Sequence, residues 1–174
     1  MRALALCHLL ALPAAAEEVL PEVWRGVSLS TSAGPLFALR QGDVSTGPAV
    51  TASLAWDLGE SFSAFAFGMG AAERAPLHAP GDWAVLAGGA GLLATLHRWP
   101  GADHENRLAM TVRVAAGWGV LAPSSGAGPF ALVAPGLAWN ARLRHFAIGL
   151  ELPVAYGPGP LVAVGLSPTL KYTF

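Results

Sequence analysis

The sequence is poor in charged residues. Lys, Arg, Asp and Glu make up only 12% of its 174 residues, with 10 basic side chains against 11 acidic ones. A soluble domain of this size normally carries about twice that share of charge. The near-zero balance provides neither a basic field nor a strongly acidic face, so nucleic-acid binding is excluded from the functions that we consider.

Cysteine is almost absent as well. The one cysteine, Cys7, lies in an N-terminal segment that has the features of a cleavable signal peptide. Arg2 supplies the positive end, Ala3–Leu12 the apolar run, and Ala14–Ala16 the cleavage site. We therefore expect residues 1–16 to be a signal peptide, cleaved after Ala16, and residues 17–174 to form one exported domain. This domain has no cysteine, which excludes disulfides and thiol chemistry.

Long apolar runs are missing too. No stretch after residue 16 offers the roughly 18 uninterrupted apolar residues that a transmembrane helix needs. The chain instead alternates with a period of two, which is the pattern of a strand whose two faces differ. The clearest case is Arg107–Leu121, where large apolar residues alternate with Ala, Gly, Thr and Arg. The other alternating segments are Val23–Thr31, Ala49–Leu58, Phe62–Ala71, Asp82–His97, Pro129–Ala141, His145–Ala155 and Val162–Phe174.

These segments predict eight strands. Asp82–His97 alternates consistently only if Gly88 and Gly89 hold a β-bulge. The expected inner turns are Gly59–Glu60, Arg98–Glu105 and Arg142–Arg144, and the expected outer loops are Gly34–Gly47, Glu73–Gly81, Ala122–Gly128 and Tyr156–Pro160. An even strand count with such connections predicts an up-and-down barrel whose two ends lie on the same side.

The face with the smaller side chains indicates which way the barrel is turned. It consists mostly of Ala, Gly, Ser and Thr, where a water-exposed face would carry Lys and Glu throughout. Its few charges are Asp57, Arg107, Arg113, Glu151 and Lys171. A charge at mid-depth on a lipid-facing surface costs roughly 2 to 4 kcal/mol, and the large apolar face has almost none: Arg25, near a strand end, is the exception.

We therefore predict an all-β fold, an eight-stranded antiparallel up-and-down transmembrane β-barrel with the large apolar face toward lipid. In Phe62–Ala71 this face consists of Phe65, Phe67 and Met69. Aromatic residues gather at both expected ends, as in the girdles of membrane barrels. The inner set is Trp24, Trp56, Trp99, Trp139, Tyr172 and Phe174, and the outer set is Trp83, Trp118, Phe130 and Tyr156. Pro135, Pro153 and Pro168 fall inside predicted strands, where bulges or strand ends should absorb them.

The export signal, the eight alternating segments and the final residues 170–174 together resemble a small bacterial outer-membrane β-barrel protein. The resemblance is one of pattern over the whole chain, without a subfamily motif. It implies that Phe174, Tyr172 and Leu170 form the signal that the outer-membrane assembly machinery recognises. It also implies that the protein is embedded in the lipid bilayer of the outer membrane.

The luminal charges allow two interpretations. Arg113 and Glu151 lie at similar depth with one strand between them, so they can pair and plug the barrel; they can also gate a narrow pore. We favour the plug because eight strands leave room for little beyond side chains.

An enzyme site can also be assembled from loop residues, with Ser124 or Ser125 as the nucleophile beside His78 and Glu73. Chance explains this grouping better, because neither the order nor the spacing of these residues matches a known arrangement. Asp103, His104 and Glu105 are expected to be a solvated turn rather than a metal site.

The sequence thus predicts a protein without catalytic activity, cofactor or metal. It would serve as a structural element or as the membrane-embedded member of an envelope complex whose partner the sequence does not identify. A narrow channel for ions or small solutes is the alternative, and a lipid-modifying enzyme comes third.

Overall fold

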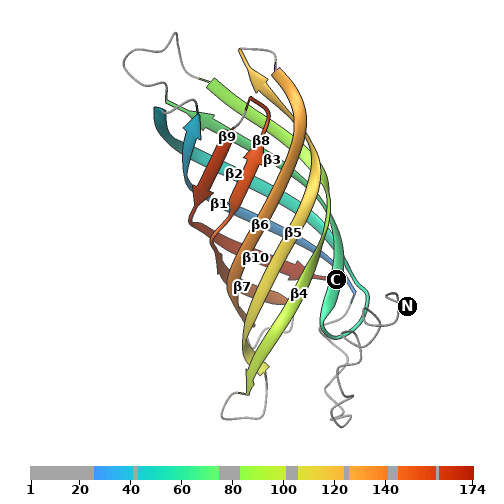
Figure 1. Ribbon diagram of the computed structural model, residues 1–174. Coiled ribbons are helices and arrows are strands. Elements are labelled where there is room, and N and C mark those ends of the chain that lie inside the picture. The colour runs from blue at the N-terminus through green and yellow to red at the C-terminus, as the bar shows by residue number, and fades with distance from the viewer. Residues whose placement is uncertain are drawn as a thin grey trace, which may run out of the picture.

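The computed structural model describes residues 26–40, 43–74, 83–100, 106–123, 126–140, 145–159 and 161–174. The predicted signal peptide, Trp24 and Arg25 lie outside these residues. The described part contains ten β-strands (Figure 1). Their bounds are β1 Val27–Arg40, β2 Asp43–Asp57, β3 Phe62–Glu73, β4 Trp83–Pro100, β5 Asn106–Ala122, β6 Gly126–Asn140, β7 Phe146–Glu151, β8 Val154–Gly157, β9 Leu161–Gly165 and β10 Ser167–Thr173.

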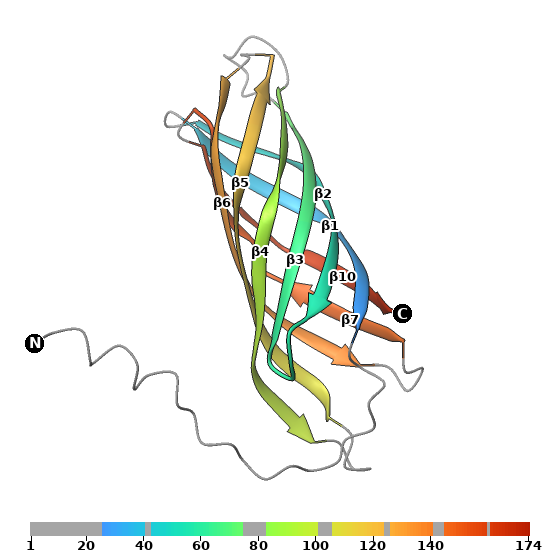
Figure 2. The ribbon, with the colours of Figure 1, turned by 90° about the vertical axis from the view of Figure 1, so that its right-hand side faces the viewer.

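The ten strands form a closed ring with eight positions. Strands β1 to β6 pair in sequence order, β7 and β8 both pair with β6, and β9 and β10 both pair with β1. β7 with β8 is therefore one interrupted strand, and β9 with β10 is another. All pairings are antiparallel, so the predicted eight-stranded up-and-down barrel is confirmed, including the closure between the first and last strands. Figure 2 shows β3 to β6 side by side along one wall.

The strands are staggered around the barrel. The partner pairs that start at Leu29 on β1 lead through each strand in turn and return to β1 at Leu39, ten residues further along. This stagger requires the strands to tilt, and an eight-stranded barrel has an interior just wide enough for side chains to fill. The lumen of this barrel should therefore be a packed interior rather than an aqueous pore.

The outward face is apolar around the ring. Leu54, Val114, Leu150 and Val164 are exposed on it, while the inward positions of β1 are the buried serines Ser28, Ser30 and Ser32. A surface of this kind faces lipid, because a soluble barrel would place its large apolar side chains inside. Across the described residues there is no helix long and apolar enough to span a membrane.

The loop predicted for Gly34–Gly47 is wrong. β1 continues to Arg40 and β2 begins at Asp43, so both strands run through most of the segment. Gly34-Pro35 and Gly47-Pro48 look like turn signals in the sequence, yet Pro35 lies opposite Pro48 within the β1–β2 ladder. A proline whose nitrogen faces the strand on the other side removes no hydrogen bond between β1 and β2. The β1–β2 hairpin can therefore extend past both prolines.

The bulge predicted at Gly88 and Gly89 is also wrong. β4 pairs with β3 and β5 without a register shift through these glycines, and the irregularity lies instead between Thr95 and His97. The inward face of β4 is consequently continuous. Trp83 and Val85, which the bulge would have turned toward lipid, point into the lumen and are buried.

The prolines inside strands are accommodated without bulges. The ladder keeps the same register on both sides of Pro135, Pro153 and Pro168. What changes is strand continuity: β7 and β8 are separated by Leu152 and Pro153, and β9 and β10 by Leu166. The expectation that strand ends absorb Pro153 is therefore correct, and the expected bulges are absent from the described ladder.

Candidate functional site

The candidate site is the interior of the barrel, which is filled in layers. At the inner end, the Asp57 carboxylate accepts hydrogen bonds from the Gly26 backbone N–H at 3.0 Å and from the Ser63 hydroxyl at 2.6 Å. These contacts tie the start of β1 to the β2–β3 turn. Asp57 is therefore held by local donors at the inner mouth. Lys171 is half-buried on the inward face of β10, in register with Ser30.

The middle layer contains an ion pair. Arg113 on β5 and Glu151 on β7 are both buried, and an Arg113 guanidinium nitrogen lies 3.2 Å from a Glu151 carboxylate oxygen. The strand between them, β6, carries Gly136 beside Glu151. A Cβ atom there would lie 2.9 Å from Glu151 Cγ, so the missing side chain leaves space for the carboxylate to reach across β6.

Arg113 has further contacts in this layer. It donates a 3.4 Å hydrogen bond to Ser53 Oγ, which in turn lies 2.7 Å from Ser30 Oγ. Its guanidinium carbon is 5.0 Å from the centre of the Phe65 ring, a cation–π distance. The cation is thus held by a carboxylate, a hydroxyl and an aromatic face that come from three different strands, and these contacts fix it in the middle of the lumen.

Above the ion pair the lumen is apolar. Phe67 on β3 lies 5.9 Å from Phe130 on β6 and 6.2 Å from Phe65, measured between ring centres, and all three rings are buried. The prediction that Phe65, Phe67 and Met69 face lipid is wrong. These three side chains fill the interior, and Ala64, Ala66, Gly68 and Gly70 face outward.

Glycines on the neighbouring strands provide the space for the β3 aromatics. Gly91 on β4 is the partner of Phe65, and a Cβ atom at Gly91 would lie 2.7 Å from the end of the Phe65 ring. Gly89 and Gly117 lie on the same inward wall, where a Cβ would meet backbone atoms of the facing strand. Large side chains from β3 and glycines from β4 and β5 therefore fit together side by side on one wall of the lumen.

The outermost layer combines apolar side chains with one carboxylate. Val85, Leu121 and Trp83 are buried there, and Glu73 at the end of β3 is only 1% exposed. Both Glu73 carboxylate oxygens are without a hydrogen-bond partner in the described part of the chain. Trp83 and Phe130, which were predicted to belong to the outer aromatic girdle, point into the lumen instead; Trp118 and Tyr156 are exposed as predicted.

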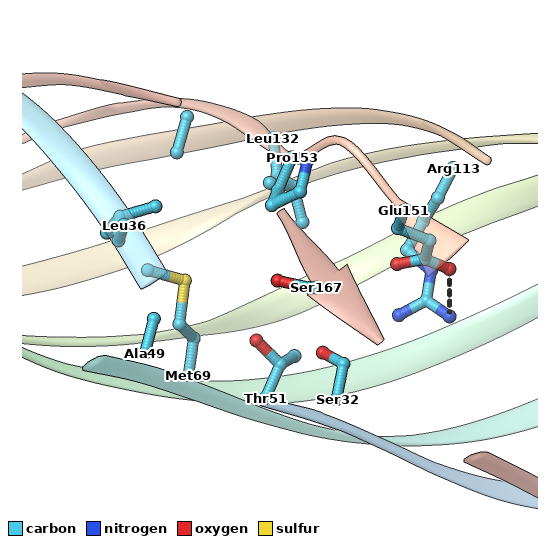
Figure 3. Close-up of a pocket in the computed structure, with 11 residues that line it drawn as sticks. Ser32, Leu36, Ala49, Thr51, Met69, Arg113, Leu132, Glu151, Pro153 and Ser167 are labelled. Carbon is cyan, nitrogen blue, oxygen red and sulfur yellow. Dashed lines mark ion pairs between the residues drawn. The ribbon is translucent and has the colours of Figure 1, made fainter. Parts of the chain in front are cut away.

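Little free space remains between these layers. A cavity of about 20 Å³ lies between the Arg113–Glu151 pair and the apolar layer (Figure 3). Ser32, Thr51 and Ser167 line its polar side, and Leu36 and Met69 lie at its other end. This volume suffices for about one water molecule. At this depth the cavity is too small for a hydrated ion.

The aromatic residues at the inner end form a belt near the closing strand. Tyr172 contacts Phe146, Phe174 and His145, with ring centres 5.0, 5.1 and 5.6 Å apart. Thr173 N–H donates to the His145 carbonyl at 2.8 Å, and Phe174 N–H donates to the Val27 carbonyl at 3.0 Å. Leu170 and Phe174 are exposed on the outward face. The last residues are therefore joined to strands on both sides.

Several sequence-predicted residues cannot be placed. The side chain of Arg107 in β5 lies outside the described part of the chain, as do His78, Ser124, Ser125, Asp103, His104 and Glu105. Of the enzyme grouping considered from the sequence, the structure describes Glu73, which is buried in the lumen. Within the described residues no group of three or more His, Cys, Asp or Glu side chains could hold a metal ion.

Comparisons with known proteins define the fold. No protein-family model matches the chain, and no curated protein matches it either. Among solved structures, Neisserial surface protein A superimposes with a TM-score of 0.67 at 11% sequence identity, over 86% of this chain and 97% of that one. Ail, the attachment invasion locus protein of Yersinia pestis, gives a TM-score of 0.52 at 13% identity, over 86% and 99%. A second Ail structure, in complex with the heparin analogue sucrose octasulfate, gives 0.55 at 12%. The chain therefore has the fold of the small outer-membrane β-barrel proteins.

Proposed function

We propose that the protein is a non-enzymatic β-barrel of the bacterial outer membrane with a closed lumen. It would serve as a structural element of the membrane or as the membrane-embedded member of a cell-envelope complex. The observation that supports this proposal is the filled interior, where the Arg113–Glu151 pair and the Phe67–Phe130 contact leave a cavity of about 20 Å³. A lumen closed along its axis would leave the outward face and the two ends as the main surfaces for contact with partners.

The test of the closed lumen is conductance. Purified protein reconstituted in planar bilayers should show no unit conductance above the bare membrane, because a hydrated ion does not fit through the middle layer. A general porin prepared in the same detergent is the positive control. The channel alternative predicts reproducible unit steps that Arg113→Ala or Glu151→Ala abolishes, and that result would refute the proposed closed lumen.

The localisation is part of the proposal. The apolar outward face and the fold both support insertion into the outer membrane, and the sequence of residues 1–16 supports export with cleavage after Ala16. A folded barrel of this type should sediment with the outer membrane and migrate differently on gels before and after heating. Its measured mass should be that of a chain that begins at Glu17. Protein found soluble in the periplasm, without a heat-dependent gel shift, would contradict the proposal.

We also propose that Leu170, Tyr172 and Phe174 act as the signal for the outer-membrane assembly machinery. Deletion of Phe174 should reduce the heat-modifiable form in the outer membrane by at least tenfold, because it removes the ring beside Tyr172 and the bond to Val27. Phe174→Tyr should restore assembly. Trp56→Ala is the matched control. Trp56 belongs to the inner set of aromatic residues and is 66% exposed, against 67% for Phe174, so its loss should leave assembly largely intact. Normal assembly without Phe174 would refute the signal.

A lipid-modifying enzyme remains the third possibility. Glu73 faces the closed lumen, so it could act only if the outer layer opened. Loss of a modified lipid product in His78→Ala would support that function. The buried position of Glu73 favours the non-enzymatic proposal.

A further inference from the structure

The backbone ladder is interrupted at one connected place that involves β1, β6, the β7–β8 strand and the β9–β10 strand. Pairing lapses at Ala134 and Pro135 of β6, at Leu152 and Pro153 between β7 and β8, at Leu166 between β9 and β10, and at residues 33–35 of β1. These residues are neighbours across the sheet: the register places Pro135 opposite Leu152, Leu152 opposite Leu166, and Leu166 opposite Pro35. In Figure 1, β8 and β9 run steeply, whereas β7 and β10 lie almost across the view. The strands therefore change direction at the interruption.

Proline accounts for the lost bonds. At three positions one bond of a hydrogen-bonded pair remains: Leu152 N–H to the Pro135 carbonyl at 2.9 Å, Gly165 N–H to the Pro153 carbonyl at 2.8 Å, and Leu166 N–H to the Pro35 carbonyl at 3.2 Å. The reciprocal bond is impossible in each pair because proline has no N–H. Each of these three adjacent boundaries between strands, here called seams, thus lacks one hydrogen bond.

The seam between β1 and the β9–β10 strand is the most affected. Hydrogen-bonded pairs alternate in an antiparallel ladder, so the pair that follows Pro35 and Leu166 is Ala33 with Pro168. Pro168 also lacks a donor. Two successive pairs of this seam are therefore each reduced, and the gap in pairing is longest here, spanning residues 33–35 of β1.

A cavity lies directly behind this seam. It is the luminal cavity, to which Ser32, Leu36 and Ser167 contribute (Figure 3). On the outer side, an open depression lies next to the seam, over the β1–β2 ladder, and is lined by Ala33, Gly34, Pro35, Pro48 and Val50. The wall in front of the cavity is thus weak in backbone bonds where β1 meets the β9–β10 strand.

We propose that the barrel opens laterally at this seam, between Ala33–Leu36 of β1 and Gly165–Pro168, and gives molecules of the bilayer access to the luminal cavity. The seam closes again in the same register because the ladders on both sides of the gap are in phase. Lateral opening leaves the Arg113–Glu151 and Phe67–Phe130 layers in place. The barrel can therefore be closed along its axis and still open toward lipid.

The lining of the cavity indicates the class of molecule. Leu36 and Met69 form an apolar end, and the hydroxyls of Ser32 and Ser167 lie nearer to the Glu151 carboxylate at the other end. A molecule with an apolar chain and a small hydrogen-bonding group matches this arrangement, since its polar end would otherwise be unpaired in hydrocarbon. Because the cavity holds about one water molecule, only the small polar group of a bilayer amphiphile would enter it, and the apolar chain would lie in the opened seam.

Thiol accessibility in lipid vesicles tests the opening. The chain from Glu17 onward has no cysteine, so Ser167→Cys places one thiol behind the seam, and Ala115→Cys places another at a buried luminal position of β5 far from it. An alkyl methanethiosulfonate dissolved in the bilayer should modify Ser167→Cys at least tenfold faster than Ala115→Cys. A charged, membrane-impermeant methanethiosulfonate should modify neither. The heat-dependent gel shift verifies that each variant is folded.

Restoring the donors provides the second arm. Pro35→Ala with Pro168→Ala, in the Ser167→Cys background, returns both missing N–H groups and should slow modification by the alkyl reagent at least fivefold. Pro168→Ala alone serves if the double variant does not fold. Equal rates at the two cysteines, or a rate unaffected by the restored donors, would overturn lateral opening. Modification of Ser167→Cys by the charged reagent as fast as by the alkyl reagent would also overturn lateral opening. It would show that the reagent enters from water along the barrel axis, and the conductance measurement tests that route independently.

Discussion

Replacement of Phe67 by Ala should lower the free energy of unfolding by about 3 to 5 kcal/mol, the range for removing a buried aromatic side chain. Phe67 is 7% exposed and packs between Phe65 and Phe130 in the lumen. Its loss would leave a void that neighbouring strands cannot close, because the ring of hydrogen bonds fixes the diameter of the barrel. Equilibrium denaturation in lipid vesicles, followed by the heat-dependent gel shift and tryptophan fluorescence, measures this loss.

Phe62→Ala is the matched control. Phe62 belongs to the same strand and is 54% exposed on the outward face, where lipid can fill the space that a truncated side chain leaves. Both variants lose the transfer free energy of a phenyl ring, and only Phe67→Ala adds a cavity. We expect Phe67→Ala to be the more destabilising by about 2 kcal/mol, given roughly 24 cal/mol per Å³ of cavity. Equal losses would mean that Phe67 is not packed in the lumen.

This comparison addresses the part of the fold that the sequence did not predict. A period of two separates a strand into two faces without saying which face is inside. On β5, β7 and β10 a charge decided the matter, because Arg113, Glu151 and Lys171 cannot face hydrocarbon at low cost. The large apolar residues opposite those charges were therefore assigned outward correctly, as the exposure of Val114, Leu150 and Leu170 shows.

The predicted β3 segment, Phe62–Ala71, had no charge on either face. Size alone was used there, and it gave the wrong result for Phe65, Phe67 and Met69. The actual strand extends to Glu73, which shares their inward face and would have oriented all of them. The sequence contains a second signal, the glycines Gly89 and Gly91 of β4, which leave space in the lumen for the β3 rings. That signal is usable only once the register between the two strands is known.

Strand ends were missed for a related reason. Gly and Pro mark turns in most sequences, so Gly34-Pro35 and Gly47-Pro48 predict the two ends of a loop. In the barrel these dipeptides lie in paired strands, and the outward apolar positions Phe37, Leu39 and Val44 continue beyond them. A proline costs a strand only the bond on the side that its nitrogen faces, so composition alone cannot show whether the chain turns there.

The ion pair leads to the second large effect. Arg113→Ala should lower the free energy of unfolding by about 3 to 5 kcal/mol, because it leaves the buried Glu151 carboxylate without its cation. Glu151→Ala should have an effect of similar size, since it leaves the guanidinium with Ser53 and the Phe65 ring as its remaining contacts. Lys171→Met is the control: this cation is only half-buried, near the inner mouth, and its replacement should cost less than about 1 kcal/mol.

The double variant Arg113→Met with Glu151→Gln distinguishes a coupled pair from two independent sites. Removing both charges eliminates the cost of an unpaired ion, and Met fills much of the space of the arginine stem, so most of the stability should return. Arg113 Nε has no hydrogen-bond partner within the described residues, so the loss of this N–H leaves no acceptor unpaired. A double-mutant cycle completed with the single variants Arg113→Met and Glu151→Gln should give a coupling of at least about 2 kcal/mol. If the double variant were as unstable as the sum of the single variants, Arg113 and Glu151 would each be held by other contacts, and the plug would not depend on their pairing.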